Sequence, residues 1–296
     1  MAGTWRVHVA RVPCSWRVRG AIAVEQVDTA MAEDRASDAA SQDAAPRDTT
    51  PQNVYDDPIF FAGYVELRRT ESGLNAVLEQ PALLRRLPPL RDLAVLDLGT
   101  GFGHFARHAR AEGARRVVGV DVSSRMLAEA RRLTAGDTIE YVEAPIEEYA
   151  AESAAFDVVV SSLALHYVAD YGAVVARVRD ALVPGGRFVF SVEHPMVTAR
   201  AEQEWLRDAA GRKELWPVDD YATEGARRTR WFRDDVIKHH RTVATYVNAL
   251  LAGGFTLLAL DEPVPTADAL AARPELESER RRPPFLLLAA ERRPRL

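Results

Sequence analysis

The sequence predicts an α/β protein with a mostly parallel sheet that helices cover on both faces. Two observations lead to this prediction. Apolar runs and amphipathic segments alternate between residues 93 and 192, which is typical of repeated strand–helix–strand units. In addition, Gly99, Gly101 and Gly103 stand between the first apolar run and the first amphipathic segment. Because glycines cost backbone entropy, this cluster indicates a main chain that a ligand approaches closely.

The alternation defines the expected elements one by one. Strands are predicted over residues 93–98, 116–120, 139–142, 157–162, 187–192, 255–260 and 285–290. Helices are predicted over residues 103–111, 124–133, 171–182 and 242–251. Ahead of the sheet, residues 59–87 carry apolar side chains at helical spacing, with a break at Ser72 and Gly73. This pattern predicts two further helices.

The first 52 residues differ in composition from the rest of the chain. Residues 30–52 consist mostly of Ala, Asp, Ser, Thr, Pro and Gln, which cannot bury enough apolar surface to offset the entropy lost on ordering. We therefore expect a disordered tail over residues 1–52 and a folded domain over residues 53–296. Met31 offers an alternative start, which would make the first thirty residues a mis-assigned extension.

Composition and charge limit the class of protein. No stretch approaches the roughly 18 consecutive apolar residues that span a bilayer, and four arginines interrupt the first twenty residues. Neither a membrane span nor a secretory signal is therefore predicted, and a cytoplasmic location is expected. The single cysteine, Cys14, permits no internal disulfide. The net charge of −5 argues against a general nucleic-acid binder.

Two acidic residues at strand ends, one before the glycine cluster and one after it in the sequence, limit the class of ligand. A glycine turn before a helix N-terminus directs backbone N–H groups toward a ligand, but the dinucleotide-binding fingerprint needs a third glycine where this chain has His104. The first strand instead ends near Asp97, whose carboxylate suits a ligand with an ammonium group. Asp121 ends the next strand, where a carboxylate can accept hydrogen bonds from both ribose hydroxyls.

A ribose and an ammonium group together fit S-adenosyl-L-methionine. The pattern resembles the class I S-adenosylmethionine-dependent methyltransferases, and within them the small-molecule branch related to ubiquinone-biosynthesis methyltransferases (methyltransferase type 11). The resemblance covers about residues 55–292 and includes FDVVVSSLALHYV at the fourth strand and ALVPGGRFVFSVEHP at the fifth. It implies a Rossmann-like, seven-stranded sheet with an N-terminal helical lid over residues 53–89. Residues 193–241, after the fifth strand, are far more than a connection needs and therefore predict an inserted substrate cap.

The resemblance also implies where the cofactor binds. Gly99 and Gly101 would approach it, Asp97 would serve its aminoacyl end and Asp121 would hold the ribose. Many relatives place an acidic residue beside the adenine, whereas this chain has Ala-Pro-Ile at the corresponding site. The expected cofactor-binding residues are Asp97, Gly99, Thr100, Gly101, Phe102, Asp121, Val122, Ala144, Pro145, Ile146, Ser162 and Leu163.

The expected cap and lid are rich in aromatic residues. Trp205, Trp216 and Trp231 lie in the cap, whereas residues 90–190 contain no tryptophan. Such side chains suit an apolar or aromatic acceptor, although they could equally form the small core of the cap itself. The cap arginines, which could hold an anionic acceptor or simply form a solvated face, are Arg227, Arg228, Arg230 and Arg233. In the lid, the candidates to contact the cofactor are Tyr55, Phe60 and Tyr64.

Methyl transfer requires an acceptor held close to the methyl group and in line with it, and an oxygen acceptor benefits from a base. The candidate catalytic residues are His194, His166, His240 and Glu193. The predicted function is methyl transfer from the cofactor sulfonium to an O, N or C atom of a small, apolar or aromatic metabolite, by a monomer or homodimer that needs no metal. The alternatives are a non-catalytic S-adenosylmethionine-binding protein and, less favoured, a NAD-dependent oxidoreductase.

Overall fold

The structure is a computed structural model that describes residues 52–69 and 73–294. All of them belong to one unit of the chain, Thr49–Leu296. The tail expected over residues 1–52, with Cys14 and Met31, lies outside the described residues apart from Gln52. None of the helices in the described ranges combines the length and apolar character that crossing a membrane requires.

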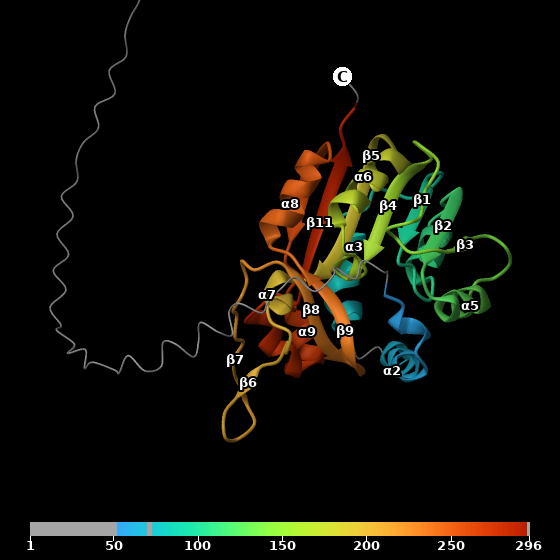
Figure 1. The fold of residues 1–296 in the computed structure, drawn as a ribbon. Coiled ribbons are helices and arrows are strands. Elements are labelled where there is room, and N and C mark those ends of the chain that lie inside the picture. Colours follow the sequence, from blue (N-terminus) through green and yellow to red (C-terminus); the bar gives the residue numbers. More distant parts are fainter. Residues whose placement is uncertain (1–51, 70–72, 295–296) are drawn as a thin grey trace, which may run out of the picture. The chain divides into compact units, whose positions relative to one another are not determined.

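A seven-stranded sheet forms the core of this unit (Figure 1). Its strands are β1 (Ala94–Leu98), β2 (Arg116–Asp121), β3 (Glu140–Glu143), β4 (Phe156–Ser162), β5 (Leu182–Glu193), β10 (Phe255–Asp261) and β11 (Phe285–Arg292). Their order is β10-β11-β5-β4-β1-β2-β3, and the pairs are parallel except for the two that contain β11. The predicted Rossmann-like α/β fold is confirmed.

The strand order reverses beside β1. The chain proceeds from β1 to β2 and β3 on one side, and then crosses to β4 and β5 on the other. In open α/β sheets, ligands bind outside the carboxyl ends of the strands at such a reversal. The end of β1 leads into the glycine turn and the end of β4 is Ser162, so the fold brings these two segments to one site.

Alternate residues of each strand pack on opposite faces of the sheet. In β1, Leu96 belongs to a buried cluster with residues of α6 (Tyr171–Ala181) and α8 (Val243–Ala252). Its neighbour Val95 belongs to a second cluster with residues of α3 (Gln80–Leu84) and α4 (His104–Ala111). Both faces of the sheet are therefore covered by helices, as predicted.

Side-chain caps fix the starts of three helices. Ser123 accepts a hydrogen bond from the Met126 backbone N–H at the start of α5 (Ser124–Leu133), and Asp170 and Thr242 cap α6 and α8 in the same way. The helices of the sheet region lie within one residue of their predicted bounds. Strand β5 differs, because it begins at Leu182 rather than at residue 187: Leu182 already pairs with β4, and a register shift absorbs the turn that follows.

Short helical elements precede the sheet. They are η2 (Val54–Asp56), α2 (Pro58–Arg69), η3 (Asn75–Glu79) and α3 (Gln80–Leu84). The two predicted helices are present as α2 and the continuous pair η3–α3. The π-helical form of η3 was not predicted, because hydrophobic periodicity does not reveal a single wide turn.

Residues 193–241 contain short strands that the sequence pattern did not predict. The elements are α7 (Pro195–Thr198), β6 (Leu206–Arg207), β7 (Lys213–Leu215), β8 (Gly225–Trp231) and β9 (Arg233–His240), with β6–β7 and β8–β9 paired as antiparallel hairpins. Phe60 of α2 packs edge-on against Trp231 and Phe232, with ring centroids 5.2 and 5.5 Å away. The second hairpin therefore packs against α2.

A further segment between β10 and β11 was also not predicted as helical. It contains α9 (Ala267–Ala272) and η5 (Pro274–Arg280). Thr266 caps α9 by accepting a hydrogen bond from the Ala269 backbone N–H, and η5 leads into the loop that carries Arg282 before β11 begins. This loop reaches the site described below.

Gly103 combines a backbone and a steric requirement. It has φ of 69°, and a Cβ at this position would lie 2.2 Å from the Tyr141 hydroxyl oxygen. Gly103→Ala is therefore expected to lower the free energy of unfolding by about 2 kcal/mol or more, from left-handed strain plus overlap. Gly136, with φ of 66° and nothing within 4 Å of such a Cβ, is the control, and Gly136→Ala is expected to lose only about 1 kcal/mol. Equal losses in urea denaturation would contradict the steric contribution of Tyr141.

Candidate active site

The glycine turn after β1 uses its three glycines differently. A Cβ on Gly99 would lie 2.4 Å from the Ala164 Cβ, and one on Gly103 would overlap Tyr141. On Gly101 (φ 53°) the nearest atom would be the Tyr64 hydroxyl oxygen, 3.9 Å away. Two of the glycines therefore permit close packing within the protein, and Gly101 presents an open backbone to the space beside it.

Asp97 and Thr100 form a buried pair at this turn. The Thr100 hydroxyl donates to Asp97 Oδ2 over 2.6 Å. Burial raises the pKa of Asp97 to about 7, and the nearby carboxylate of Asp121 adds to the shift while Thr100 opposes it. A cationic ligand group beside Asp97 would favour its ionised form.

Asp121 connects the ends of β1 and β2. Its Oδ2 accepts a hydrogen bond from the Gly101 backbone N–H at 2.8 Å, and its Oδ1 accepts one from the Ser123 N–H at 3.0 Å. Burial raises its pKa to about 6, against the effect of these hydrogen bonds. Because an ionised carboxylate can accept about four hydrogen bonds, each oxygen retains capacity for a ligand hydroxyl.

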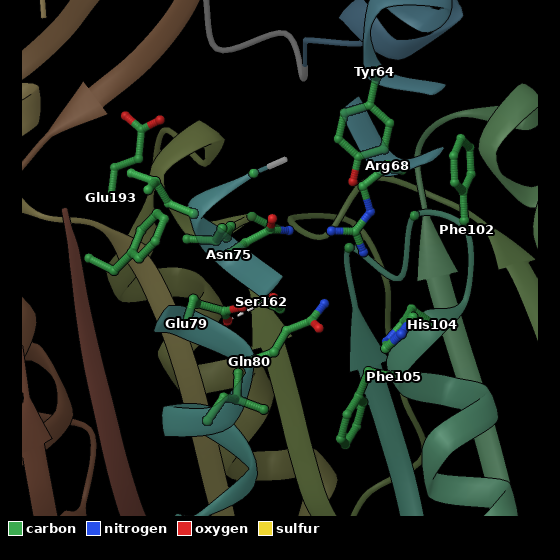
Figure 2. A pocket seen from close by; sticks show the side chains of 18 of the residues that line it. Tyr64, Arg68, Asn75, Glu79, Gln80, Phe102, His104, Phe105, Ser162 and Glu193 are labelled. Carbon is green, nitrogen blue, oxygen red and sulfur yellow. Dashed lines mark hydrogen bonds between the residues drawn. The ribbon is translucent and has the colours of Figure 1, made fainter. Parts of the chain in front are cut away.

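A cavity of about 410 Å³ lies beside the glycine turn and the two aspartates. Asp97, Gly101 and Asp121 border it together with residues of α2, η3, β4 and β5, including Ser162 and Glu193. Figure 2 shows part of its wall, with the labelled side chains Tyr64, Arg68, Asn75, Glu79, Gln80, Phe102, His104 and Phe105 around one space.

A smaller cavity of about 70 Å³ adjoins the first at Gly99 and Asp121. Its walls include Val122, Pro145 and Ile146, as expected for an adenine site, but not Ala144. The Ala144 backbone N–H donates to the Asp121 carbonyl and its side chain packs on the core, so Ala144 lies behind the residues that border this cavity. Glu147 borders this cavity instead, and sequence reasoning missed it.

Glu79 is a buried carboxylate at the ends of β4 and β5. Its Oε1 accepts hydrogen bonds from the hydroxyls of Ser162 at 2.8 Å and Ser191 at 2.5 Å, and the dashed line in Figure 2 marks the first. Its Oε2 has no hydrogen-bond partner among the described residues. Burial raises its pKa, although the serine hydroxyls oppose the shift. Leu163, at φ 52°, follows Ser162 and also borders the large cavity.

Two of the four catalytic candidates do not border either cavity. His194 caps α7 by accepting a hydrogen bond from the Met196 backbone N–H, and its Nε2 lies 2.9 Å from Glu262 Oε1. His240 is fully buried, with Nδ1 2.9 Å from the Thr198 hydroxyl and Nε2 2.9 Å from the Tyr221 carbonyl. Because both nitrogens of each ring are occupied by protein groups, the structure does not support either histidine as a base.

The other two candidates, His166 and Glu193, border the large cavity. Glu193 is paired with Lys238 of β9, whose Nζ lies 2.6 and 2.8 Å from its two carboxylate oxygens and 3.0 Å from Gln203 Oε1. Although burial alone would raise it, the ammonium of Lys238 holds the pKa of Glu193 below its usual value. Sequence reasoning missed Lys238, which is 2% exposed.

His166 is a neutral ring at the wall of the cavity. Burial lowers its pKa to about 4. The Glu193 backbone N–H donates to its Nδ1 at 3.4 Å, which assigns the proton of the neutral ring to Nε2. Its ring lies 4.4 Å, centroid to centroid, from that of Tyr167.

Aromatic side chains from the predicted lid, from the predicted cap and from the segment after β4 form one wall of the large cavity. Tyr55 packs edge-on against Tyr64 and Tyr167, with centroids 5.4 and 6.2 Å away, and Tyr64 contacts Trp231 at 6.3 Å. All four border the cavity. Trp205 and Trp216 instead pack on each other, 5.4 Å apart, and do not line it.

The four cap arginines are engaged within the protein. Arg233 lies 2.9 Å from Asp57, Arg228 and Arg230 lie 3.6 and 3.5 Å from Asp235 and Asp234 of the same hairpin, and Arg227 donates to backbone carbonyls. None borders either cavity. An anionic acceptor held by these four residues is therefore not supported. The described residues also contain no group of acidic, histidine or cysteine side chains that could hold a metal ion.

Comparison with known proteins agrees with this geometry. Residues 96–190 match a family model described as a methyltransferase domain. The crystal structure of an S-adenosylmethionine-dependent methyltransferase from Mesorhizobium loti is 44% identical, and the match covers 75% of this chain and 99% of that one with a TM-score of 0.69. An uncharacterized protein of Haemophilus influenzae is 32% identical over 247 residues, covering 81% of this chain and 97% of its own length.

The chain belongs to the S-adenosylmethionine-dependent methyltransferases, and S-adenosyl-L-methionine is its cofactor. The resemblance predicted from the sequence is thus confirmed. A malonyl-acyl-carrier-protein O-methyltransferase of Enterobacter lignolyticus is 39% identical over 124 residues, which span 48% of its length and 42% of this chain.

Proposed function

We propose that this methyltransferase transfers a methyl group to an O, N or C atom of a small, apolar or aromatic acceptor. The observation that carries the proposal is the continuous cavity of about 410 Å³, which runs from the glycine turn to the wall formed by Tyr55, Tyr64, Tyr167 and Trp231. A cavity with an apolar wall and a few convergent polar groups is the usual form of a small-molecule site. The malonyl-acyl-carrier-protein relative matches over less than half of its length, so its acceptor does not define this one.

The cofactor would occupy the part of the cavity nearest the strand ends. Asp121 keeps free acceptor capacity at the position where ribose hydroxyls would donate, and the adjoining slot between Val122, Pro145 and Ile146 has the apolar walls that an adenine ring needs. Asp97 and Thr100 would surround the aminoacyl end, and Ser162 and Leu163 would line the face where the methyl group is transferred. These residues fit S-adenosylmethionine, which supplies a methyl group on a positively charged sulfur when bound.

The acceptor would lie between the cofactor and the aromatic wall. Tyr64 of α2 and Trp231 of β8 would exclude water from it, and Glu193 and His166 would contribute polar contacts. Neither is poised as a strong base, since Lys238 neutralises Glu193 and burial lowers the pKa of His166 to about 4. The acceleration would therefore come mainly from alignment and exclusion of water.

The test is to incubate the protein with methyl-labelled S-adenosylmethionine and a panel of phenols, amines, carboxylic acids and quinone precursors. We expect label in at least one acceptor, and calorimetry should give one S-adenosylhomocysteine bound per chain. Binding of NAD without S-adenosylhomocysteine would contradict the cofactor assignment. Tight cofactor binding with no transfer across the panel would favour the non-catalytic alternative.

A further inference from the structure

We infer that the acceptor of the proposed reaction carries a carboxylate group, and that Arg282 binds it. This inference rests on the proposed function and adds a chemical class to it. Arg282 lies in the loop between η5 and β11, borders the large cavity and is 8% exposed. Pro284 and Phe285, which follow it, border the same cavity, so this loop forms part of the acceptor wall.

The guanidinium of Arg282 lacks partners for most of its donors. Nη2 lies 3.2 Å from Glu279 Oε2, but Nε and Nη1 have no hydrogen-bond partner among the described residues. A buried donor left unpaired costs about 1–3 kcal/mol, and more for a charged group. Buried polar groups in folded proteins are nearly always paired, so a missing ligand is the simplest account of this arginine.

Two tryptophans hold the guanidinium in place. Its Cζ lies 3.9 Å from the ring centroid of Trp216 and 5.6 Å from that of Trp205. Stacking fixes the plane of an arginine while leaving its edge donors free for an anion. The two cap tryptophans that do not line the cavity thus position a residue that does.

The charges around Arg282 leave one positive charge in excess. The two carboxylates that act on it are Glu279 and Glu193. Glu279 Oε1 already lies 3.2 Å from the ammonium of Lys213, and both oxygens of Glu193 bind Lys238. Three cations therefore share two carboxylates.

The remaining titratable groups nearby do not supply the missing charge. The pKa values of His166 and His194 are lowered by burial, so both rings are neutral at pH 7. Glu262 lies beside His194 and is not one of the carboxylates that act on Arg282. Arg281 is exposed and donates to the backbone carbonyls of Lys213 and Glu214 in β7. A single negatively charged group on the acceptor would balance Arg282, with the rest of that molecule against the aromatic wall.

The test uses matched acids and amides with the full chain saturated by S-adenosylhomocysteine. The probes are benzoate and benzamide, 4-hydroxyphenylacetate and its amide, and indole-3-acetate and its amide, measured by calorimetry at pH 7.5. We expect at least one acid to bind at least about tenfold more tightly than its amide. Arg282→Gln should remove this preference. Arg280→Gln, at an exposed arginine that pairs with Glu277 on the surface, is the control and should keep it.

The affinity for S-adenosylhomocysteine separates this inference from the proposed function, because Arg282→Gln should leave it unchanged. Arg282→Lys keeps the charge and serves if the glutamine variant does not fold; it should keep part of the acid preference. The inference is overturned if no acid is preferred over its amide, including the case in which no probe binds at all, or if Arg282→Gln keeps the preference. If the unaltered protein does not bind S-adenosylhomocysteine, the proposed function itself is overturned instead.

Discussion

Asp121→Asn is expected to lower the affinity for S-adenosylhomocysteine at least about 100-fold. Two ribose hydroxyls that donate to an ionised carboxylate are worth about 1.5–3 kcal/mol each, and a loss of about 2.7 kcal/mol corresponds to 100-fold. Asparagine also brings an amide N–H₂ against the N–H groups of Gly101 and Ser123, which now donate to the carboxylate. Calorimetry gives the affinity, and thermal unfolding shows whether the variant is folded.

Asp157→Asn is the matched control. Asp157 lies at the opposite end of the sheet, where its Oδ2 accepts a hydrogen bond from the Ala94 backbone N–H and from Arg115. We expect its replacement to leave the affinity within about twofold. An Asp121→Asn variant with unchanged affinity would show that another group holds the ribose.

The same site should bind its ligand more weakly in acid. Burial raises the pKa of Asp121 to about 6 and that of Asp97 to about 7, so the unliganded fold holds more protons than the unfolded chain between pH 4 and 7. The free energy of unfolding is therefore favoured most by these two carboxyl groups at low pH, where both are protonated. It falls as pH rises through this window. Because the ligand binds the ionised forms, its affinity should increase over the same window. Binding at pH 6 should release protons, measurable in buffers of different ionisation enthalpy.

Sequence patterns predicted the sheet and the glycine turn because both are determined by residues that are close together in the sequence. Strands buried on both faces read as continuous apolar runs, and Asp97, Gly101 and Asp121 stand at strand ends that the parallel arrangement brings together. The π-helical turn at Asn75–Glu79 and the hairpins of residues 193–241 have no such signal. Strands β6 and β7 have only two and three residues. Strands β8 and β9 are longer but partly exposed, and this second hairpin packs on α2, which is far away in sequence.

The polar groups of the acceptor side were harder to find, because each depends on a partner far away in sequence. Glu193 was recognised as a candidate, but its partner Lys238 is 45 residues further on. Arg282 stands out only in the structure, where Trp216 stacks on its guanidinium and Glu279 lies beside it. His194 shows the converse: its position after β5 suggested catalysis, whereas in the structure its ring caps the next helix.

Lys238→Met is expected to lower the free energy of unfolding by about 3 kcal/mol, because it leaves Glu193 buried without its cation. The lower end of the usual 3–5 kcal/mol range applies, since the Glu193 side chain keeps 20% exposure. For a domain of this size, the melting temperature should fall by about 6–12 °C. In the same hairpin, Arg228 and Asp235 are both 68% exposed and 3.6 Å apart, so Arg228→Met serves as control and should cause no measurable loss.

The double variant Lys238→Met/Glu193→Leu distinguishes an unpaired charge from lost packing. Removing both charges should recover stability to within about 1 kcal/mol of the original protein, whereas a packing defect would persist.

The loss in Lys238→Met should also depend on pH. In the original protein the pKa of Glu193 is lowered, so its favourable contribution is present at pH 7 and fades as pH falls below the usual value. Without Lys238, burial raises that pKa, and the penalty should grow from pH 5 to pH 8. A loss that is equal at both pH values and persists in the double variant would show that Lys238 acts by packing rather than by charge.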